Sequence, residues 1–450
     1  MNFIGAGFIF FFLLNQGRGI SQVLHDGNIH GGLHAPNIIL IVIDDLGYGD
    51  LGIFGNKDHQ TPNMDRLGKE GILFTDFHAN APVCSPTRAA LMTGQYQQRS
   101  EVEHAIGFTL KEGLPLHKTT VAERLQSSGY STAVFGKWHL GHVTRFEPND
   151  QGFSQSCVSN NTPDYHSHVS REGERDWYKN QVLLEESGYL TDLVNDYSIR
   201  FIEESSETPF FLFISHLAVH FPFQGPNDPI HRTLGKTWHD SKFGPLPESQ
   251  YRRAYKDMLE AVDASIGQVI EKLEDLGLRE KTLIFITSDN GAYSWVGSNF
   301  PYSGQKGDLL EGGHRVPAIA NWPGKIEAGR ITSETSMTMD LAPTFLSLSG
   351  LNFINDNDMD GVDLGPVLFQ NEKLIPRQLF WRFNNPYEDS KAFAVRDGDW
   401  KYHVVNGERF LFHLNLDPLE KTNLIHVYPD KAECLERDYD KWLAEIEKEL

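Results

Sequence analysis

The chain has 450 residues, of which 40% are hydrophobic and 22% are charged, the composition of a folded globular protein. Its 40 Lys and Arg against 61 Asp and Glu give a formal net charge of −21, which argues against a general surface for nucleic acid or anionic membranes. The three cysteines, Cys84, Cys157 and Cys434, are too few for a disulfide framework.

The apolar stretch Phe3–Leu14 predicts an export signal. It is too short to cross a bilayer and has the length of the hydrophobic part of a signal peptide, although no Lys or Arg precedes it. We therefore expect residues 1–22 to be a signal peptide and the chain to have no membrane span. The protein would be secreted or periplasmic, or would reach a lysosomal-type compartment in a eukaryote.

Residues 36–370 alternate apolar runs with amphipathic segments, a pattern typical of an α/β domain with a mostly parallel or mixed sheet between helices. The apolar, β-branched run Asn37–Asp44 predicts a central strand that is buried on both faces. Further buried strands are expected at Ser131–Gly136, Pro209–Ser215 and Thr282–Asp289. A long helix is expected from Tyr251 to about Leu276, because its apolar residues fall on one face.

The pattern changes after about residue 370. The segment AFAVRDGDWKYHVVNGERFLFHLNLDP alternates apolar and polar residues around Asp-Gly and Asn-Gly turns, which predicts antiparallel hairpins. A final helix, AECLERDYDKWLAEIEKEL, would pack on them. Residues 371–450 are therefore expected to form a small α+β subdomain.

Polar side chains follow the predicted strands where each strand ends. Asp44 and Asp45 follow the first strand, and Asp289 and Asn290 follow the strand that begins at Thr282. Ligands of doubly wound sheets bind beyond the carboxyl ends of the strands. Three carboxylates and an amide carbonyl form an all-oxygen set that suits Ca²⁺ or Mg²⁺, so the two pairs predict a metal site.

Cationic side chains occur at the same predicted edge. Lys137 and His139 follow one strand, His216 and His220 follow another, and Lys306 lies in a glycine-rich segment that allows close approach of a ligand.

Cys84 stands in the segment PVCSPTRAALMTG, which predicts the start of a helix. Ser85 is expected as the N-cap, Pro86 as the first helical residue and Gly94 as the helix end. Cys84 would then lie at a helix N-terminus that favours an anion, with Arg88 one turn into the helix. A buried structural cysteine and a plain thiolate nucleophile are the alternatives, but no cysteine-hydrolase pattern accompanies Cys84.

The segment CSPTRAALMTGQ resembles the sulfatase signature C-x-P-x-R. The remaining sulfatase motifs are matched along the chain, from about residue 36 to the C-terminal hairpins, by Asp44-Asp45, GKWHLG, the His before FP, SDNG and GQKGDLLEGGHRVPAIANWPG. The sequence is thus similar to formylglycine-dependent type I sulfatases of the alkaline phosphatase superfamily, of the arylsulfatase or N-acetylgalactosamine-6-sulfatase kind. The resemblance implies the alkaline phosphatase-like fold and the hydrolysis of a sulfuric ester.

The resemblance also implies how the site is built. Cys84 would be oxidised to formylglycine by a formylglycine-generating maturation enzyme. One divalent cation, typically Ca²⁺ with Mg²⁺ as the alternative, would be held by Asp44, Asp45, Asp289, Asn290 and the modified Cys84.

Five further residues are assigned roles through the resemblance. Arg88, Lys137 and Lys306 would stabilise the charged transition state. His139 would take a proton from the formylglycine hydrate, and His220 with Lys306 would protonate the leaving alcohol. Lys137, His220 and Lys306 would also contact the substrate, whereas His216 has no clear counterpart in the family.

The segment Thr162–Asn180 is an insertion rich in aromatic residues, His and Arg. Aromatic faces stack on sugars, and Arg171 or Arg175 could meet a further sulfate or carboxylate of the substrate, although an ordinary surface loop explains the segment equally well. Together with export and acidity, the segment favours a sulfated carbohydrate, such as a polysaccharide, as substrate. The competing functions are a phosphate or phosphonate ester hydrolase of the same superfamily and a non-catalytic sulfated-glycan-binding protein in which Cys84 is not matured.

Overall fold

The computed structural model describes residues 35–107, 111–142, 145–237, 248–351, 359–385 and 390–448. The signal peptide expected over residues 1–22 lies outside these ranges. Ala35–Leu450 is one compact unit. Among the residues described, no helix combines the length and apolar character needed to cross a bilayer.

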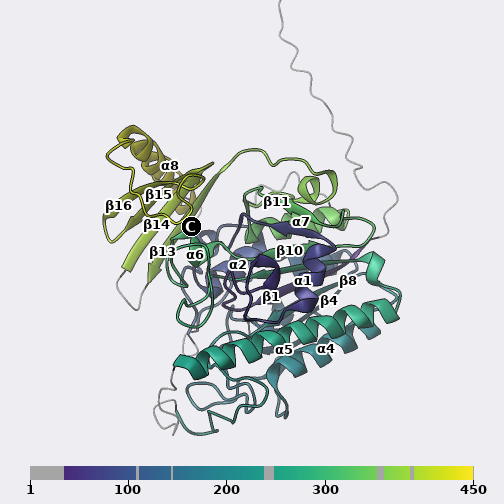
Figure 1. The fold of residues 1–450 in the computed structure, drawn as a ribbon. Coiled ribbons are helices and arrows are strands. Elements are labelled where there is room, and N and C mark those ends of the chain that lie inside the picture. Colours follow the sequence, from purple (N-terminus) through teal and green to yellow (C-terminus); the bar gives the residue numbers. More distant parts are fainter. Residues whose placement is uncertain are drawn as a thin grey trace, which may run out of the picture. The chain divides into compact units, whose positions relative to one another are not determined.

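A ten-stranded mixed sheet forms the centre of this unit (Figure 1). Strand β1 (Asn37–Ile43) lies between β8 (Phe210–His216) and β9 (Thr282–Ser288) and is parallel to both. Strand β4 (Ser131–Lys137) continues the parallel part beside β8, whereas β10 (Ala318–Asn321) is antiparallel to β9. The outer strands are β2 (Ile72–Phe74), β5 (Gln155–Ser159), β6 (Tyr178–Lys179), β7 (Val182–Leu183) and β11 (Arg330–Thr332).

Both faces of the sheet are covered by helices because β1 has apolar side chains on both sides. Alternate residues from Ile39 to Ile43 pack toward α1 (Pro62–Lys69), α4 (Leu190–Glu204) and α5 (Glu248–Asp275). Residues from Ile38 to Val42 on the other face pack toward helices α2 (Cys84–Thr93), α3 (Val121–Ser127) and α7 (Leu341–Leu348). The predicted α/β fold is thus confirmed.

Short elements complete this part of the chain. Strand β3 (Phe77–His78) pairs with β12 (Ser336–Met337) in a separate ribbon, and α6 spans Glu311–His314. The described ranges contain 3₁₀ turns at Gly52–Phe54, Gln97–Ser100, Pro148–Gln151, Arg279–Lys281 and Thr338–Asp340, and a π-helical turn at Pro366–Gln370.

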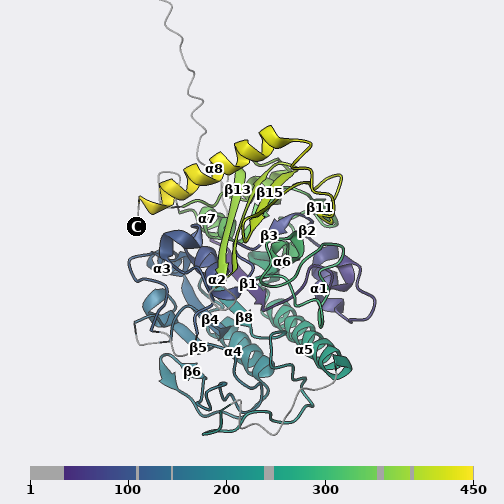
Figure 2. The same cartoon turned by 90° about the vertical axis from the view of Figure 1, so that its left-hand side faces the viewer.

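The C-terminal region forms a separate antiparallel sheet, as expected. It consists of β13 (Gln378–Asn385), β14 (Ser390–Asp397), β15 (Trp400–Val405) and β16 (Glu408–His413). The Asn-Gly turn before β16 has positive φ at Asn406 and Gly407, the conformation of a tight hairpin. Helix α8 (Pro429–Glu447) lies across one face of this sheet (Figure 2), where Tyr439 stacks on Phe393.

The opposite face of the C-terminal sheet packs against the part of the chain that contains the large sheet. The indole of Trp381 donates to Ala79 O, and a buried ionic cluster joins the two parts. We define this cluster as Asp76, His78, Glu311, His314, Arg315, Arg396, Lys401 and Glu420. Lys401 Nζ lies 2.9 Å from Glu311 Oε1 and 2.8 Å from Glu420 Oε1, so its charge is balanced on both sides.

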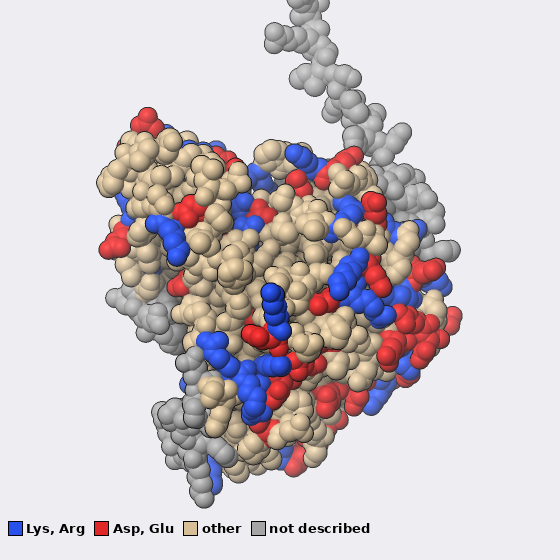
Figure 3. Space-filling view, in the orientation of Figure 1, with Lys and Arg blue, Asp and Glu red and all other residues tan. Residues whose placement is uncertain are grey.

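The surface carries charges of both signs. On the face drawn in Figure 3, acidic and basic side chains lie side by side and do not form one continuous basic surface.

Candidate active site

Two pairs of polar residues meet at the carboxyl edge of the large sheet because their strands are neighbours. Ile43 of β1 is in register with Ser288 of β9, so the residues that follow them lie side by side. The backbone N of Asp45 donates to Asp289 Oδ1 at 3.3 Å, and Asn290 Nδ2 donates to Asp45 Oδ1 at 2.7 Å. The structure therefore brings together the two polar pairs, Asp44-Asp45 and Asp289-Asn290, that the sequence places after separate strands.

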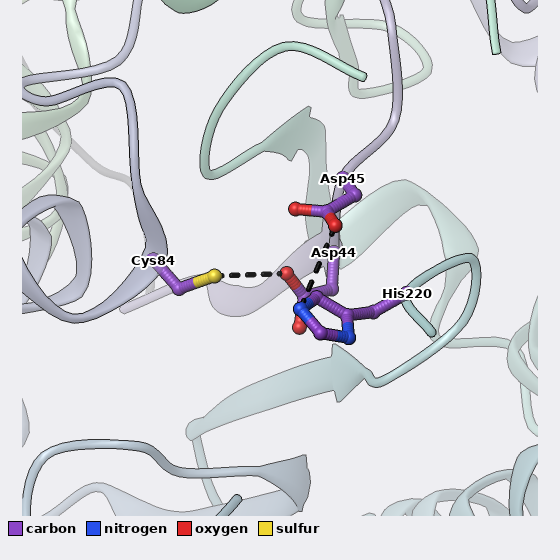
Figure 4. A group of neighbouring side chains, drawn as sticks. All are labelled: Asp44, Asp45, Cys84 and His220. Atoms are coloured by element: carbon purple, nitrogen blue, oxygen red, sulfur yellow. Dashed lines mark hydrogen bonds and ion pairs between the residues drawn. The ribbon is translucent and has the colours of Figure 1, made fainter. Parts of the chain in front are cut away.

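Cys84 is the first residue of α2 and faces this edge (Figure 4). Its sulfur lies 3.3 Å from Asp44 Oδ1. The expectation that Ser85 caps the helix is wrong, because the helix begins one residue before it and Val83 is the N-cap. Ser85 Oγ instead accepts from the backbone N of Ile106, and Pro86 is tolerated in a first turn whose N–H groups have no helical partner.

Arg88 is completely buried and joins the ends of three strands. Its Nε and Nη2 lie 2.9 and 2.8 Å from Asp289 Oδ2, and its Nη1 donates to Lys137 O and to Ser215 Oγ. Ser215 in turn donates to Lys137 O at 2.6 Å. Ser215 was not among the expected site residues, because a serine at the end of an apolar strand carries no motif of its own.

Two lysines each pair with one of the carboxylates that follow β1. Lys137, at the end of β4 and fully buried, is ion-paired with Asp44. Lys306 Nζ lies 2.6 Å from Asp45 Oδ1 and 3.5 Å from the sulfur of Cys84. Burial disfavours the ammonium form of Lys306, but Asp45 and the other negative groups around it, among them Asp44, together raise its pKa well above the usual range. Lys306 therefore stays charged.

The segment around Lys306 is fixed at several points by backbone hydrogen bonds. Its own N–H donates to Ala292 O, and that of Gly307 donates to Pro82 O, two residues before Cys84. Ser303 Oγ donates to Leu419 O in the C-terminal region. The helix N-terminus, the loop after β9 and the C-terminal region thus all hold the loop that carries Lys306.

The histidines lie in different surroundings. His220 Nε2 lies 3.6 Å from Asp45 Oδ2, and burial followed by Lys306 lowers its pKa to about 4. His139 Nε2 contacts Ile106 O while Nδ1 has no partner among the described residues, and burial followed by Lys137 lowers its pKa well below the usual range. His216 is buried with both ring nitrogens unpartnered there, and burial alone lowers its pKa to about 3.

The donor set fits a hard divalent cation. Asn290 Oδ1 is buried without a hydrogen-bond partner in the described part of the chain. Burial, together with the Asp44 carboxylate, raises the pKa of Asp289 to about 6, so these acidic groups repel one another despite Arg88. Ligand atoms of Asp44, Asp45, Cys84 and His220 lie within 4.8 Å of one another. An orphaned amide oxygen beside mutually repelling carboxylates is what Ca²⁺ or Mg²⁺ would satisfy.

A second group of three residues, His78, Glu311 and His314, could also hold a metal by spacing alone. Unlike the donor set that contains Asn290, these three residues leave no buried side-chain nitrogen or oxygen without a hydrogen-bond partner in the described part of the chain. Lys401 Nζ lies 2.9 Å from Glu311 Oε1 and 3.1 Å from His314 Nε2, and Arg396 Nη1 lies 2.9 Å from His78 Nε2. We therefore assign this group a structural role.

The thiol of Cys84 is poorly suited to act as a thiolate. Burial and the neighbouring Asp44 carboxylate raise its pKa far above the ordinary value, despite the nearby Lys137 and Lys306. A thiolate nucleophile requires a lowered pKa. The environment thus opposes the plain cysteine mechanism and leaves room for a modified side chain.

Arg171 and Arg175 are not brought to this site by any described hydrogen bond or ion pair. Arg175 Nη2 is paired with Glu185 Oε1 at 2.5 Å, and Arg171 lies in an exposed turn. Their assignment to substrate binding stays a prediction.

Comparisons with known proteins agree with this geometry. A family model described as Sulfatase matches residues 36–351, and one described as N-sulphoglucosamine sulphohydrolase, C-terminal, matches residues 305–449. The N-acetylgalactosamine-6-sulfatase of Rattus norvegicus is 34% identical over 412 residues, covering 83% of this chain and 72% of that protein. Arylsulfatase G of the same species is 33% identical over 424 residues, covering 83% and 77%.

Solved structures share the fold. The structure of Ps i-CgsB in complex with k-i-k-neocarrahexaose has a TM-score of 0.81 at 29% identity, covering 91% of this chain and 93% of that one. The phosphonate monoester hydrolase of Agrobacterium radiobacter, at 22% identity and a TM-score of 0.67, covers 92% and 96% and shows the fold alone. With one family model spanning the large sheet and the other the C-terminal sheet, the chain belongs to the sulfatase family, the enzymes that hydrolyse sulfuric esters.

Proposed function

We propose that this sulfatase removes sulfate from a carbohydrate through formylglycine made from Cys84. One observation carries the proposal: the Cys84 sulfur lies at the start of α2, 3.3 Å from Asp44 Oδ1 and 3.5 Å from Lys306 Nζ. A nucleophile at this point faces both the oxygen ligands and a charged ammonium.

Formylglycine would allow the enzyme-bound sulfate to be released, which a serine in its place would not. Its hydrated aldehyde carries two hydroxyl groups on one carbon. One hydroxyl, after giving up its proton, would be the nucleophile toward the ester sulfur. The other, by giving up its proton as the carbonyl re-forms, would allow sulfate to be released, and water would then restore the hydrate.

The surrounding residues would divide the proton transfers and the charge. His139, neutral and with no described partner at Nδ1, would accept the proton of the second hydroxyl. His220 and the charged Lys306 would supply the proton for the leaving alcohol. A bound sulfate ester would raise the lowered pKa of His220, because a nearby anion favours the imidazolium. Arg88 and Lys137 would balance the charge of the transition state.

The cation would be held by Asp44, Asp45, Asp289, Asn290 and the modified Cys84. When bound, it would lower the pKa of the attacking hydroxyl and polarise the sulfate oxygens. Ca²⁺ and Mg²⁺ both prefer oxygen ligands. We propose Ca²⁺, which the family resemblance implies, with Mg²⁺ as the alternative.

A sulfated carbohydrate is the proposed substrate class. The relative named N-acetylgalactosamine-6-sulfatase and the structural neighbour solved with k-i-k-neocarrahexaose support it. Arg171 and Arg175 are retained as candidate contacts to a second anionic group. An exported location and a dependence on a formylglycine-generating enzyme complete the proposal.

The deciding experiment is mass spectrometry of the Cys84 peptide from active protein, made in a host that contains the maturation enzyme. Formylglycine at Cys84, with turnover in a panel of sulfated mono- and oligosaccharides, is the expected result. An unmodified thiol in fully active protein would refute the mechanism, and a matured but inactive protein would favour the glycan-binding alternative. Matched phosphate and phosphonate esters test the remaining alternative, for which slower turnover is expected.

A further inference from the structure

Five aromatic side chains pack against one another in a cluster beside the candidate site, which we call the aromatic wall: Phe221, Phe223, Tyr251, Tyr293 and Trp295. The ring of Trp295 has its centroid 5.3 Å from that of Phe223, 5.6 Å from that of Tyr251 and 6.3 Å from that of Tyr293. Phe223 in turn lies 5.8 Å from Phe221. Trp295 is therefore the member at which these contacts converge.

The aromatic wall begins at the two residues assigned to the leaving oxygen. Lys306 Nζ lies 5.5 Å from the centroid of the Tyr293 ring, on the side of the ring that attracts a cation. At the other end, Phe221 follows His220 in sequence, and His220 Nδ1 contacts Phe221 O at 2.7 Å. A single ring thus separates Trp295 from the ammonium of Lys306.

Trp295 is held in a fixed turn. The backbone N and Oγ of Ser294 donate to Gln305 Oε1 at 3.1 and 2.7 Å, and Gln305 directly precedes Lys306. The N–H groups of Val296 and Gly297 both donate to Tyr293 O and close the turn. The position of the indole is therefore coupled to that of Lys306.

Trp295 nevertheless remains 40% exposed. Exposure by itself does not mark a binding surface, since Phe300 of the same loop is 74% exposed. Trp295 differs because its ring contacts three other aromatic rings, one of which lies against the ammonium of Lys306. Its neighbours cover one part of the ring and leave the remainder open to solvent.

We propose that the exposed indole of Trp295 is the stacking surface for a pyranose ring of the leaving alcohol. The inference rests on the proposed function, because it supplies the sugar contact that the sulfate-binding residues lack. The C–H face of a sugar ring packs on an aromatic face while its hydroxyl groups stay in water or bind polar residues. The location next to His220 and Lys306 places such a ring on the side of the ester where the alcohol departs.

A stacking contact of this kind acts on the bound sugar before and during the reaction alike. Its loss should therefore raise KM and leave kcat nearly unchanged, because uniform binding does not lower the barrier of the chemical step. A residue that only positions Lys306 would behave differently, since its loss would lower kcat.

The test compares Trp295→Ala and Trp295→Phe with the wild type. The substrate is the fastest member of the sulfated-sugar panel, and inorganic sulfate serves as a competitive inhibitor that fills the anion site alone. We expect Trp295→Ala to raise KM for the sugar sulfate about tenfold, the effect of losing one aromatic contact. The inhibition constant of sulfate should stay unchanged, and Trp295→Phe should restore most of the affinity.

Phe300→Ala is the matched control, since Phe300 is an aromatic residue of the same loop, is 74% exposed, and has no described ring contact with the aromatic wall. It should leave KM unchanged. The inference is overturned if Trp295→Ala leaves KM unchanged, if it lowers kcat instead, or if it weakens sulfate inhibition equally. If the wild-type protein hydrolyses aryl sulfates but no sugar sulfate, it is the proposed substrate class that fails. This result would be known before any variant is made.

Discussion

The ammonium group of Lys306 lies 2.6 Å from Asp45 Oδ1, although the two residues are 261 positions apart in the chain. The same group lies 3.5 Å from the sulfur of Cys84, at the start of α2. Three segments that are far apart in the sequence therefore meet at one point. The loop that carries Lys306 provides a positive charge there.

Lys306→Met should lower kcat about 10²- to 10³-fold, the effect of removing one preorganised donor to the charged transition state. Steady-state kinetics with 4-nitrophenyl sulfate measures the loss. Lys421→Met, which removes an exposed lysine of the C-terminal region, is the control and should keep full activity. Equal kinetics of the two variants would contradict the role of Lys306.

His216, at the end of β8, and His220, which follows it, should differ in how their loss depends on the leaving group. Proton donation is worth about 10²- to 10⁴-fold, and it matters most for poorly acidic alcohols such as sugars. His220→Ala should therefore damage sugar-sulfate turnover far more than aryl-sulfate turnover, while His216→Ala should affect both less. The ratio of kcat values for the two substrates is the measurement, and a leaving-group-dependent loss in His216→Ala instead would reverse the assignment.

Asn290→Ala should weaken the binding of a divalent cation, because the buried Oδ1 of Asn290 would no longer be available as a ligand. Metal content by inductively coupled plasma mass spectrometry, after dialysis, gives the result. Asn321→Ala is a matched control, since Asn321 is a buried asparagine at the end of β10 that is hydrogen-bonded to Leu67 O and Arg279. Undiminished metal content in Asn290→Ala, or full activity after exhaustive chelation, would exclude the site.

Lys401→Met should lower the free energy of unfolding by about 3–5 kcal/mol, because it removes the ammonium that the buried carboxylates of Glu311 and Glu420 share. Lys431→Met breaks the partly exposed pair with Asp397 and should cost no more than about 1 kcal/mol. Urea unfolding followed by circular dichroism compares them. Equal losses of unfolding free energy would show that the buried ionic cluster stabilises the fold no more than a partly exposed ion pair does.

His403→Leu should make the protein less sensitive to acid. His403 is buried without a hydrogen-bond partner among the described residues, beside a cavity of about 240 Å³, and burial followed by Lys401 lowers its pKa to about 3. The unfolded chain binds a proton below its pKa of about 6.5 while the folded protein does not, so wild-type stability falls as the pH drops through that value.

The difference between the two proteins should therefore grow from pH 6.5 downward and reach about 2 kcal/mol at pH 5 relative to pH 7.5. Urea unfolding at both pH values measures it. Parallel pH profiles for the wild type and His403→Leu would contradict the assignment.

The sequence was sufficient for the central strands because burial leaves a direct pattern. The continuous apolar run of β1 and the polar residues that end β1 and β9 place the carboxylates together once the strands are known to be parallel neighbours. The turns of the C-terminal sheet were predictable for a similar reason, since Asn406 and Gly407 adopt the positive φ that an Asn-Gly pair favours.

Other features depend on tertiary contacts that no local pattern encodes. The start of α2 was misplaced because Ser85 has the residue type of an N-cap, whereas its hydroxyl is used by Ile106. Lys401 and Glu420 look like solvent-exposed charges of a hairpin region, and only the packing of the two sheets buries them against Glu311. Trp295 likewise reads as one aromatic residue of a loop until its neighbours are known.

The burial of Cys84 sets a time limit on its proposed conversion. In the finished fold its side chain is 2% exposed, at the first turn of a helix whose residues are all buried, so another enzyme cannot reach it there. The loop that carries Lys306 gains its last anchors only when Leu419 and Glu420 have been made. At about 5–20 residues per second, tens of seconds pass between the synthesis of Cys84 and the synthesis of Glu420. If Cys84 is converted as proposed, the segment that contains Leu419 and Glu420 would therefore set how long the nascent chain stays open to maturation.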